Sequence, residues 1–316
     1  MLRTILALLQ IKGIGNAFIK KNLITLQQVD IHNLEQVCGL DKRISADVLV
    51  DNYTYADKII ERCHELNIRI CHIGDNLYPK SLMELNDAPA ILYLRGNTSL
   101  LSSKIVSIIG TRESSLLGNS IAQKVGSFMS NHCSICNGLV DGIDKAAVSN
   151  GNSVLKNVIG VIASGLNYEV TSSNITKTLA EQVLHNNGLL ISEFEPDKKE
   201  DMFSGSKASR IQAGISNAVI LVQSSIDGGS KYTLNTISKL NRVLGVVNFS
   251  SSNEFNTDDK FSANRLIIAK RRDGLAEMCE IKNCSNIKVE IVDINSSDDY
   301  NIIVKKISNN FTYSLF

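Results

Sequence analysis

Apolar residues follow one another without alternation in several short runs between positions 105 and 249. The clearest run is Ile105–Ile109, which is apolar except for Ser107, ends at Gly110 and precedes a segment of helical character that extends to about Met129. A strand that is apolar on both faces is typical of the central parallel sheet of an α/β domain. Ser114 or Ser115 can cap the helix that follows it.

Strand and helix patterns continue to alternate towards the C-terminus. The pattern predicts strands over 134–137, 158–163, 189–191, 219–223 and 244–249, and helices over 143–149, 174–186, 207–215 and 232–240. This order, with Val- and Ile-rich strands, predicts an α/β fold with a doubly wound, mostly parallel sheet. Ligands of such sheets bind beyond the carboxyl ends of the strands, so the turns at 110–112, 138–144, 164–167 and 228–233 are the candidate site.

The regions on either side of this core have a different character. Residues 1–66 have a helical pattern, and Lys12–Asn16 joins two short helices as in a helix–hairpin–helix module, which either contacts a DNA backbone or only packs. The pattern predicts three units: a helical module over 1–66, the α/β domain over 67–284, and a short extension over 285–316 with one strand-like run (289–294) and a short helix. The serine- and asparagine-rich segment 250–259 is predicted to be a mobile loop.

Composition limits the choice of partner and compartment. The chain is 43% apolar, enough for a real core, and its 33 basic and 32 acidic residues leave a net charge of +1, so nucleic-acid binding requires a local basic surface. Seven scattered cysteines indicate reduced thiols in the cytoplasm, and Cys133 and Cys136 lack the second pair that a zinc site needs. We expect no signal peptide and no membrane partner, because the apolar runs are too short.

The turn Gly110-Thr111-Arg112 is the strongest candidate for chemistry. It would place backbone N–H groups, a helix N-terminus and a guanidinium together, an arrangement that favours an anion such as a phosphate. The alternative is an ordinary strand–turn–helix connection whose arginine is solvated.

Several motifs together resemble the DprA/Smf DNA-processing family. They are Tyr78-Pro79, Pro89 to Gly96, Ile109 to Arg112, Gly138 to Asp144, Ser164 to Asn167, Ser192-Glu193, Arg210 to Gly214, Gly229 to Thr233 and Asn264 to Ile267. The resemblance implies an extended Rossmann-like fold and a homodimer that binds single-stranded DNA. It also implies protection of incoming strands and assistance in loading a RecA-type recombinase during natural transformation, with no catalytic residue, metal or cofactor.

Carried over onto this sequence, the family motifs predict a set of DNA- and phosphate-binding residues. The set is Gly110, Thr111, Arg112, Ser115, Gly138, Gly142, Asp144, Lys207, Arg210, Gly229, Ser230, Lys231 and Thr233. The segment Gly205–Arg210 departs from the family, which has an arginine-rich sequence there. Only Lys207 and Arg210 keep positive charge, so the cationic lining is thinner than in the family.

Two other functions are consistent with the same pattern. One is a nucleotide-binding sensor or phosphoribohydrolase-like enzyme of the related superfold, for which Glu193 is the candidate acid. The other is a degenerate paralogue that acts as a scaffold, which the missing arginines favour.

The resemblance also implies a dimer contact in the C-terminal part of the sheet domain. We expect strand 244–249 to lie at the sheet edge, and Leu266, Ile267 and Ile268 to form an apolar cluster on a helix over 264–269. Arg265 and Lys270–Arg272 would then surround the interface. The alternative is that this cluster packs on the sheet of its own subunit.

Overall fold

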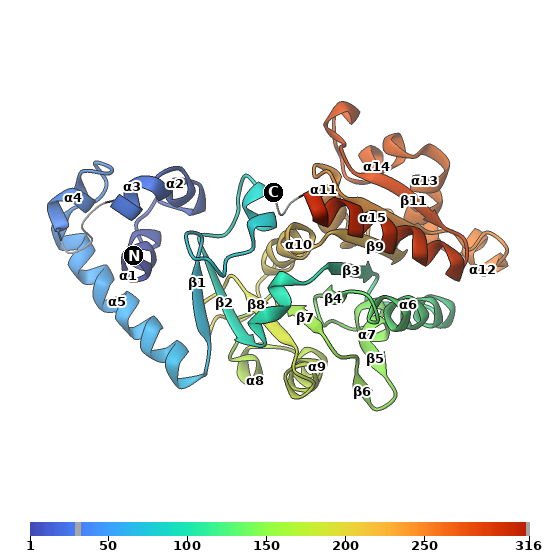
Figure 1. The fold of residues 1–316 in the computed structure, drawn as a ribbon, viewed down its shortest axis with the longest axis horizontal. Coiled ribbons are helices and arrows are strands. Elements are labelled where there is room, and N and C mark those ends of the chain that lie inside the picture. The colour runs from blue at the N-terminus through green and yellow to red at the C-terminus, as the bar shows by residue number, and fades with distance from the viewer. Residues whose placement is uncertain (29–32, 314–316) are drawn as a thin grey trace.

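A nine-stranded sheet runs through the middle of the molecule (Figure 1). The structure is a computed structural model that describes residues 1–28 and 33–313. The spatial order is β1 (Arg69–His72), β2 (Ile91–Gly96), β8 (Leu189–Ser192), β7 (Val158–Val161), β4 (Ser134–Asn137), β3 (Ile105–Gly110), β9 (Ala218–Gln223), β10 (Val243–Val247) and β11 (Glu290–Ile294). The pairs β1–β2 and β2–β8 are antiparallel, and the other pairs are parallel. The predicted doubly wound, mostly parallel sheet is therefore confirmed.

Helices cover both faces of the sheet. One face carries α6 (Leu116–Met129), α7 (Ile143–Val148) and α9 (Asn174–His185), and the other carries α10 (Ser204–Ile215), α11 (Ser230–Ser238), α13 (Ser262–Lys270) and α14 (Arg272–Met278) (Figure 1). The long C-terminal helix α15 (Tyr300–Tyr313) packs against α6 and β10. Short elements complete this part: α8 (Tyr168–Thr171), α12 (Asn253–Thr257) and the hairpin of β5 (Ser149–Asn150) and β6 (Ser153–Val154).

The local rules that predicted the central unit hold in the structure. Strand β3 is buried along its length up to Gly110, as expected for a strand with helices on both sides. The Ser115 side chain caps α6, since its oxygen accepts a hydrogen bond from the Gly118 N–H at 3.0 Å. Helix α10 begins three residues before its predicted start, because the Asp201 carboxylate accepts hydrogen bonds from the Phe203 and Ser204 N–H groups.

The described residues of the N-terminal part form five helices: α1 (Leu2–Leu9), α2 (Asn16–Lys21), α3 (Leu23–Gln28), α4 (Leu34–Cys38) and α5 (Ala46–Glu65). They are tied to the sheet by polar contacts, including Tyr55 to Glu195 at 2.5 Å and Arg62 to Asp197 at 2.8 Å. The Lys20 ammonium donates to the carbonyl oxygens of Met83 and Leu85, both at 2.7 Å, so it is held against the domain. The boundaries at 66 and 284 stay predictions, and residues 29–32 and 314–316 lie outside the described part.

Two expectations for the C-terminal half are wrong. The strand predicted over 244–249 is not an edge strand, because residues 290–294 form β11 and pair in parallel with β10. The segment 250–259 is not simply a loop, since it contains α12, whose Phe255 is buried against Phe261 with ring centroids 5.0 Å apart. None of the helices in residues 1–28 and 33–313 is long and apolar enough to cross a membrane.

Candidate nucleic-acid interface

The direction of winding changes between the neighbouring strands β3 and β9. The helix after β3 covers one face of the sheet and the helix after β9 covers the other, so the two turns diverge and leave a crevice at the carboxyl edge. The buried Gln223 side chain holds the crevice together: its oxygen accepts from the Ser115 N–H at 3.0 Å and its nitrogen donates to Ser115 Oγ at 2.9 Å. Ser115 is one of the two residues predicted to cap the helix after β3, and Gln223 is the last residue of β9.

A groove of about 560 Å³ occupies this crevice. Eight of the thirteen predicted site residues line it: Gly110, Thr111, Arg112, Gly138, Asp144, Gly229, Ser230 and Thr233. The structure thus brings together three turns, of which the first and the last are more than a hundred positions apart in sequence. Glu200, Asp201 and Met202 also line the groove, and the sequence did not single them out. Gln212 and Tyr232 line it too; they lie within the named motifs but outside the predicted set.

Ser115 and Gly142 support the groove from behind rather than line it. Gly142 has a φ of +77°, and a Cβ at this position would lie 2.3 Å from the Thr111 carbonyl oxygen and 2.5 Å from that of Arg112. A side chain here would therefore displace the arginine turn. The next residue fastens the same turn, because the Ile143 N–H donates to the Thr111 carbonyl at 3.1 Å.

Asp144 is a buried carboxyl group on the floor of the groove. Its Oδ2 accepts a hydrogen bond from the Gly138 N–H at 2.8 Å. Burial raises the pKa of Asp144 to about 7, while the Gly138 and Val140 N–H groups and the Arg112 charge act in the opposite direction. A carboxyl in this state orders the turn at 138–140 and changes charge near neutral pH.

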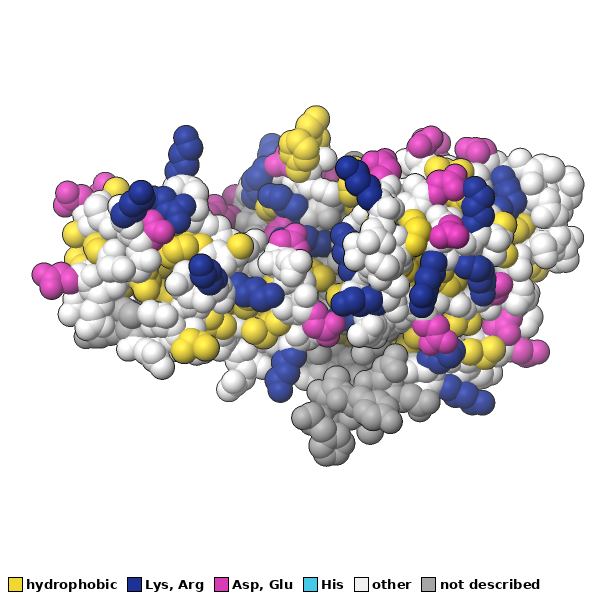
Figure 2. Space-filling view, turned by 90° about the horizontal axis from the view of Figure 1, so that it is seen from above, with side chains coloured by type: hydrophobic (Ala, Val, Ile, Leu, Met, Phe, Trp, Pro, Cys, Tyr) yellow, Lys and Arg dark blue, Asp and Glu magenta, His cyan; other side chains and the backbone are white. Residues whose placement is uncertain are grey.

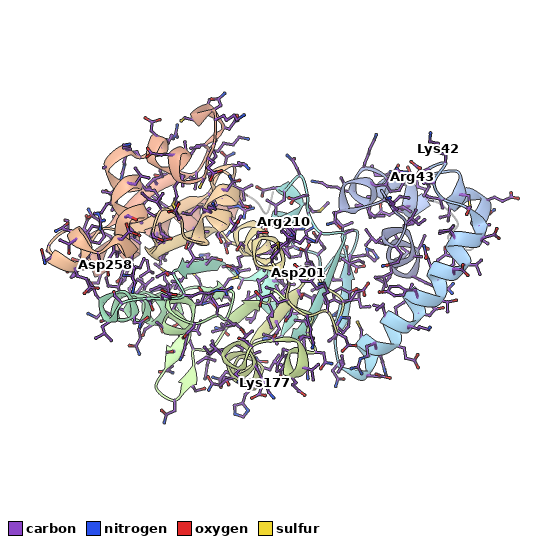
Figure 3. All side chains as sticks on the ribbon, turned by 180° about the vertical axis from the view of Figure 1, so that it is seen from behind. Lys42, Arg43, Lys177, Asp201, Arg210 and Asp258 are labelled. Carbon is purple, nitrogen blue, oxygen red and sulfur yellow. The ribbon has the colours of Figure 1, made fainter. Side chains whose placement is uncertain are left out.

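The other three predicted residues point elsewhere. The Arg210 guanidinium forms a two-pronged ion pair with Glu193, at 2.6 and 2.9 Å, and a further contact with Asp87 at 2.9 Å. Figure 3 shows Arg210 and Asp201 in the α10 region of the molecule. Lys207 lies over the Phe194 ring at 5.5 Å, and Lys231 faces Glu280 at 3.6 Å. Their contact with DNA stays a prediction.

The groove carries little positive charge. Among its described lining residues Arg112 is the only cation, whereas Glu113, Asp144, Glu200 and Asp201 supply carboxyl groups. The Arg112 side chain is 64% exposed and lies 3.8 Å from Glu200. Figure 2 shows basic and acidic side chains interspersed over the upper face rather than gathered in one continuous band.

A second groove, of about 650 Å³, lies where α13, α14 and the start of β11 meet. Its cations are Lys270, Arg271, Arg272 and Lys288, and its carboxylates are Asp273 and Glu290. Arg271 joins the two helices at a φ of +53° and pairs with Asp293. This is the basic run noticed in the sequence, now placed beside the edge strand.

The residues considered for catalysis or metal binding, Glu193, Cys133 and Cys136, do not line the groove. Glu193, the candidate acid of the enzyme hypothesis, is bound by Arg210 and does not line the groove. The described part of the chain contains no group of three or more His, Cys, Asp or Glu residues that could hold a metal ion. Cys133 and Cys136 are buried free thiols, and burial raises their pKa values to about 11 and about 12.

The fold and the groove define a doubly wound α/β protein with a polar groove at its switch point. A family model for DNA recombination-mediator protein A matches residues 69–279, and the chain belongs to that family. The DNA processing protein DprA of Streptococcus pneumoniae is 33% identical over 165 residues, which cover 51% of this chain and 56% of that protein. Protein Smf of Escherichia coli is 28% identical over 168 residues, covering 53% of this chain and 44% of that protein.

Solved structures agree with this assignment. The X-ray structure of DNA processing protein A from S. pneumoniae has a TM-score of 0.67 at 25% identity and covers 93% of this chain and 95% of that one. A structure of the protein from Helicobacter pylori, reported for its single-stranded DNA binding mode, has a TM-score of 0.59 at 22% identity and covers 75% of this chain and 96% of that one. The second likeness concerns the fold alone.

Proposed function

We propose that the chain binds single-stranded DNA across the groove at the β3–β9 switch point. The observation that carries this proposal is the convergence of the turns after β3, β4 and β9 on one groove. Membership of the recombination-mediator family supports it. By analogy with the DNA-processing relatives, we further propose that the chain protects incoming strands and assists a RecA-type recombinase in transformation. The matched segment covers only about half of those relatives.

Phosphate groups would bind at the rim of the groove. Arg112 is exposed there, and α11 begins at Ser230, which also lines the groove. A guanidinium and a helix N-terminus both favour a phosphate oxygen. A flexible single strand can adjust its backbone to place one phosphate at each of these positions, whereas the stiff duplex cannot.

Exposed apolar side chains at the rim suit unpaired bases. Met202 is 85% exposed and Tyr232 is about half exposed, and both line the groove. A base can stack on the Tyr232 ring whatever its identity, and one such stack contributes about 1–3 kcal/mol. Met202 adds apolar contact area beside it. Duplex DNA has no free base faces to offer, so this rim favours single strands.

We also propose that the chain works as a homodimer through α13 and the neighbouring edge of the sheet. Leu266 and Ile268 on α13 are only half-buried, whereas Ile267 is buried within its own subunit. The basic groove of Lys270–Arg272 and Lys288 lies at the end of this helix, so two copies would combine their basic surfaces. The free cysteines are consistent with action in the cytoplasm.

Fluorescence anisotropy with a labelled 20-nucleotide strand and the matching duplex, across a salt series, tests the main proposal. We expect the single strand to bind more tightly, with an affinity that falls as salt rises. Equal affinity for both forms, or no binding at low salt, would contradict it. The mutation Gly142→Ala, which disturbs the arginine turn, should weaken binding, whereas Gly151→Ala should not: Gly151 also has a positive φ but lies in the β5–β6 hairpin with nothing near its Cβ position.

A further inference from the structure

Three polar side chains on the floor of the groove have no hydrogen-bond partner among the described residues. They are Gln212 on α10 and Ser230 and Thr233 on α11, and each residue is more than nine-tenths buried. Buried carboxamide and hydroxyl groups are normally paired, since leaving one unpaired costs free energy. Neighbouring groups follow that rule: Ser107 and Ser216, for example, share a hydrogen bond of 2.8 Å. The polar atoms of these three side chains open into the groove and are not sealed in the interior, so a ligand that enters the groove can bond to them.

The chemistry of the floor argues against a phosphate. Asp144 shares the floor, Asp201 and Glu200 stand on the wall, and the single arginine is at the exposed rim. A phosphate placed on the floor would meet carboxylates at short range in a site of low dielectric. Neutral hydroxyl and carboxamide groups instead match the edge of a nucleobase, which carries neighbouring donors and acceptors.

Gly138 leaves the space that a base edge would enter. A Cβ on this residue would lie 3.1 Å from Asp144 Oδ2 and 3.1 Å from Gln212 Nε2. One acceptor and one donor thus face the same small space, which any side chain at 138 would fill. Cytosine offers the complementary pattern, because its exocyclic amine donates and its ring nitrogen and carbonyl accept. Thymine has a carbonyl in place of that amine, and this oxygen would face the Asp144 carboxylate.

We propose that the groove floor is a base-reading pocket, in which Gln212, Ser230, Thr233 and Asp144 select an unpaired base with an exocyclic amine over thymine. This inference rests on the proposed binding of single-stranded DNA and adds a base preference to it. Phosphates stay at the rim with Arg112, and the base points inward.

Binding of labelled (dC)12 and (dT)12 at pH 8 tests the pocket, because the two strands carry the same number of phosphates. We expect the wild type to bind (dC)12 about tenfold more tightly, as for one well-formed base contact. Thr233→Val and Gln212→Leu should reduce this ratio towards one while (dT)12 affinity changes little. Thr236→Val is the matched control: it lies on the same helix outside the groove, and its hydroxyl is already bonded to the Tyr232 carbonyl.

A measurement on the wild type alone guards against variants that fail to fold. Methylating both amine hydrogens of the cytosines should lower the affinity of (dC)12 to that of (dT)12. Equal wild-type affinity for the two strands, or an equal loss for both strands in the floor variants, would overturn the base pocket and leave DNA binding standing. Failure to bind either strand at low salt would overturn the proposed function itself.

Discussion

Replacing Arg210 with alanine should destabilise the protein strongly. Its side chain is 12% exposed and that of Glu193 is 8% exposed, and two hydrogen bonds of 2.6 and 2.9 Å join them. The same guanidinium also reaches Asp87 Oδ2 at 2.9 Å and the Lys207 carbonyl at 2.8 Å. Removing it leaves the Glu193 carboxylate buried without its counter-charge, because the carboxylate has no other described cation beside it.

The size of the effect follows from this burial. Breaking one partner of a buried ion pair costs about 3–5 kcal/mol, whereas loss of an exposed pair costs about 0–1 kcal/mol. At about 2–4 °C per kcal/mol for a protein of this size, the melting temperature should fall by roughly 10 °C. The double variant Arg210→Met with Glu193→Leu removes both charges, and it should recover much of that loss.

Thermal unfolding followed by circular dichroism measures this directly. Arg62→Ala serves as the control, since its partners Asp197 and Glu65 are about half exposed and the expected loss is small. DNA binding of Arg210→Ala should be measured well below its melting temperature. A melting temperature within 2 °C of wild type, together with a large loss of affinity, would refute the structural role and assign Arg210 to the DNA contact.

Three other predictions concern the groove and the dimer. Arg112→Ala should weaken single-strand binding and reduce the log–log salt slope by about 0.7, the share of one phosphate. Lys177→Ala on α9 is the control and should leave the slope unchanged, because Lys177 does not line the groove and lies well away from the groove residue Asp201 in Figure 3. An unaltered slope in Arg112→Ala would make that residue structural. The pKa of Asp144 is about 7 in the fold against an ordinary 3.8, so the folded state holds the extra proton and stability falls as the pH rises from about 4 to above 7. Asp144→Asn removes this pH dependence. The unfolding free energy of the variant, measured by urea titration relative to wild type, should therefore rise by about 2 kcal/mol between pH 5.5 and pH 8. A free-energy difference between variant and wild type that does not change with pH would show that Asp144 has an ordinary pKa. Light scattering should give a dimer for the wild type and a monomer for Ile268→Glu at micromolar concentration, and a monomeric wild type would refute the proposed interface.

Local sequence patterns were enough to predict the buried central strand, the helix cap and most of the turns that line the groove. The unalternating apolar run at 105–109 can only be buried on both faces, and Ser115 supplies the cap that starts the next helix. These features depend on a few neighbouring residues, so a single sequence reveals them. The glycine-containing turns are equally local, and eight of the thirteen predicted residues line the groove.

Only the tertiary structure decided which side chains face the groove and which are taken by other partners. Arg210 contacts Glu193 and Asp87 because β8, α10 and the segment before β2 converge. These contacts join residues far apart in the chain, so sequence spacing does not predict them. Gln212 and Thr233 have ordinary helical positions in the sequence, and they become a polar floor only where α10 and α11 pack side by side. The edge of the sheet was equally hidden, because pairing of β11 with β10 depends on contacts more than forty residues apart.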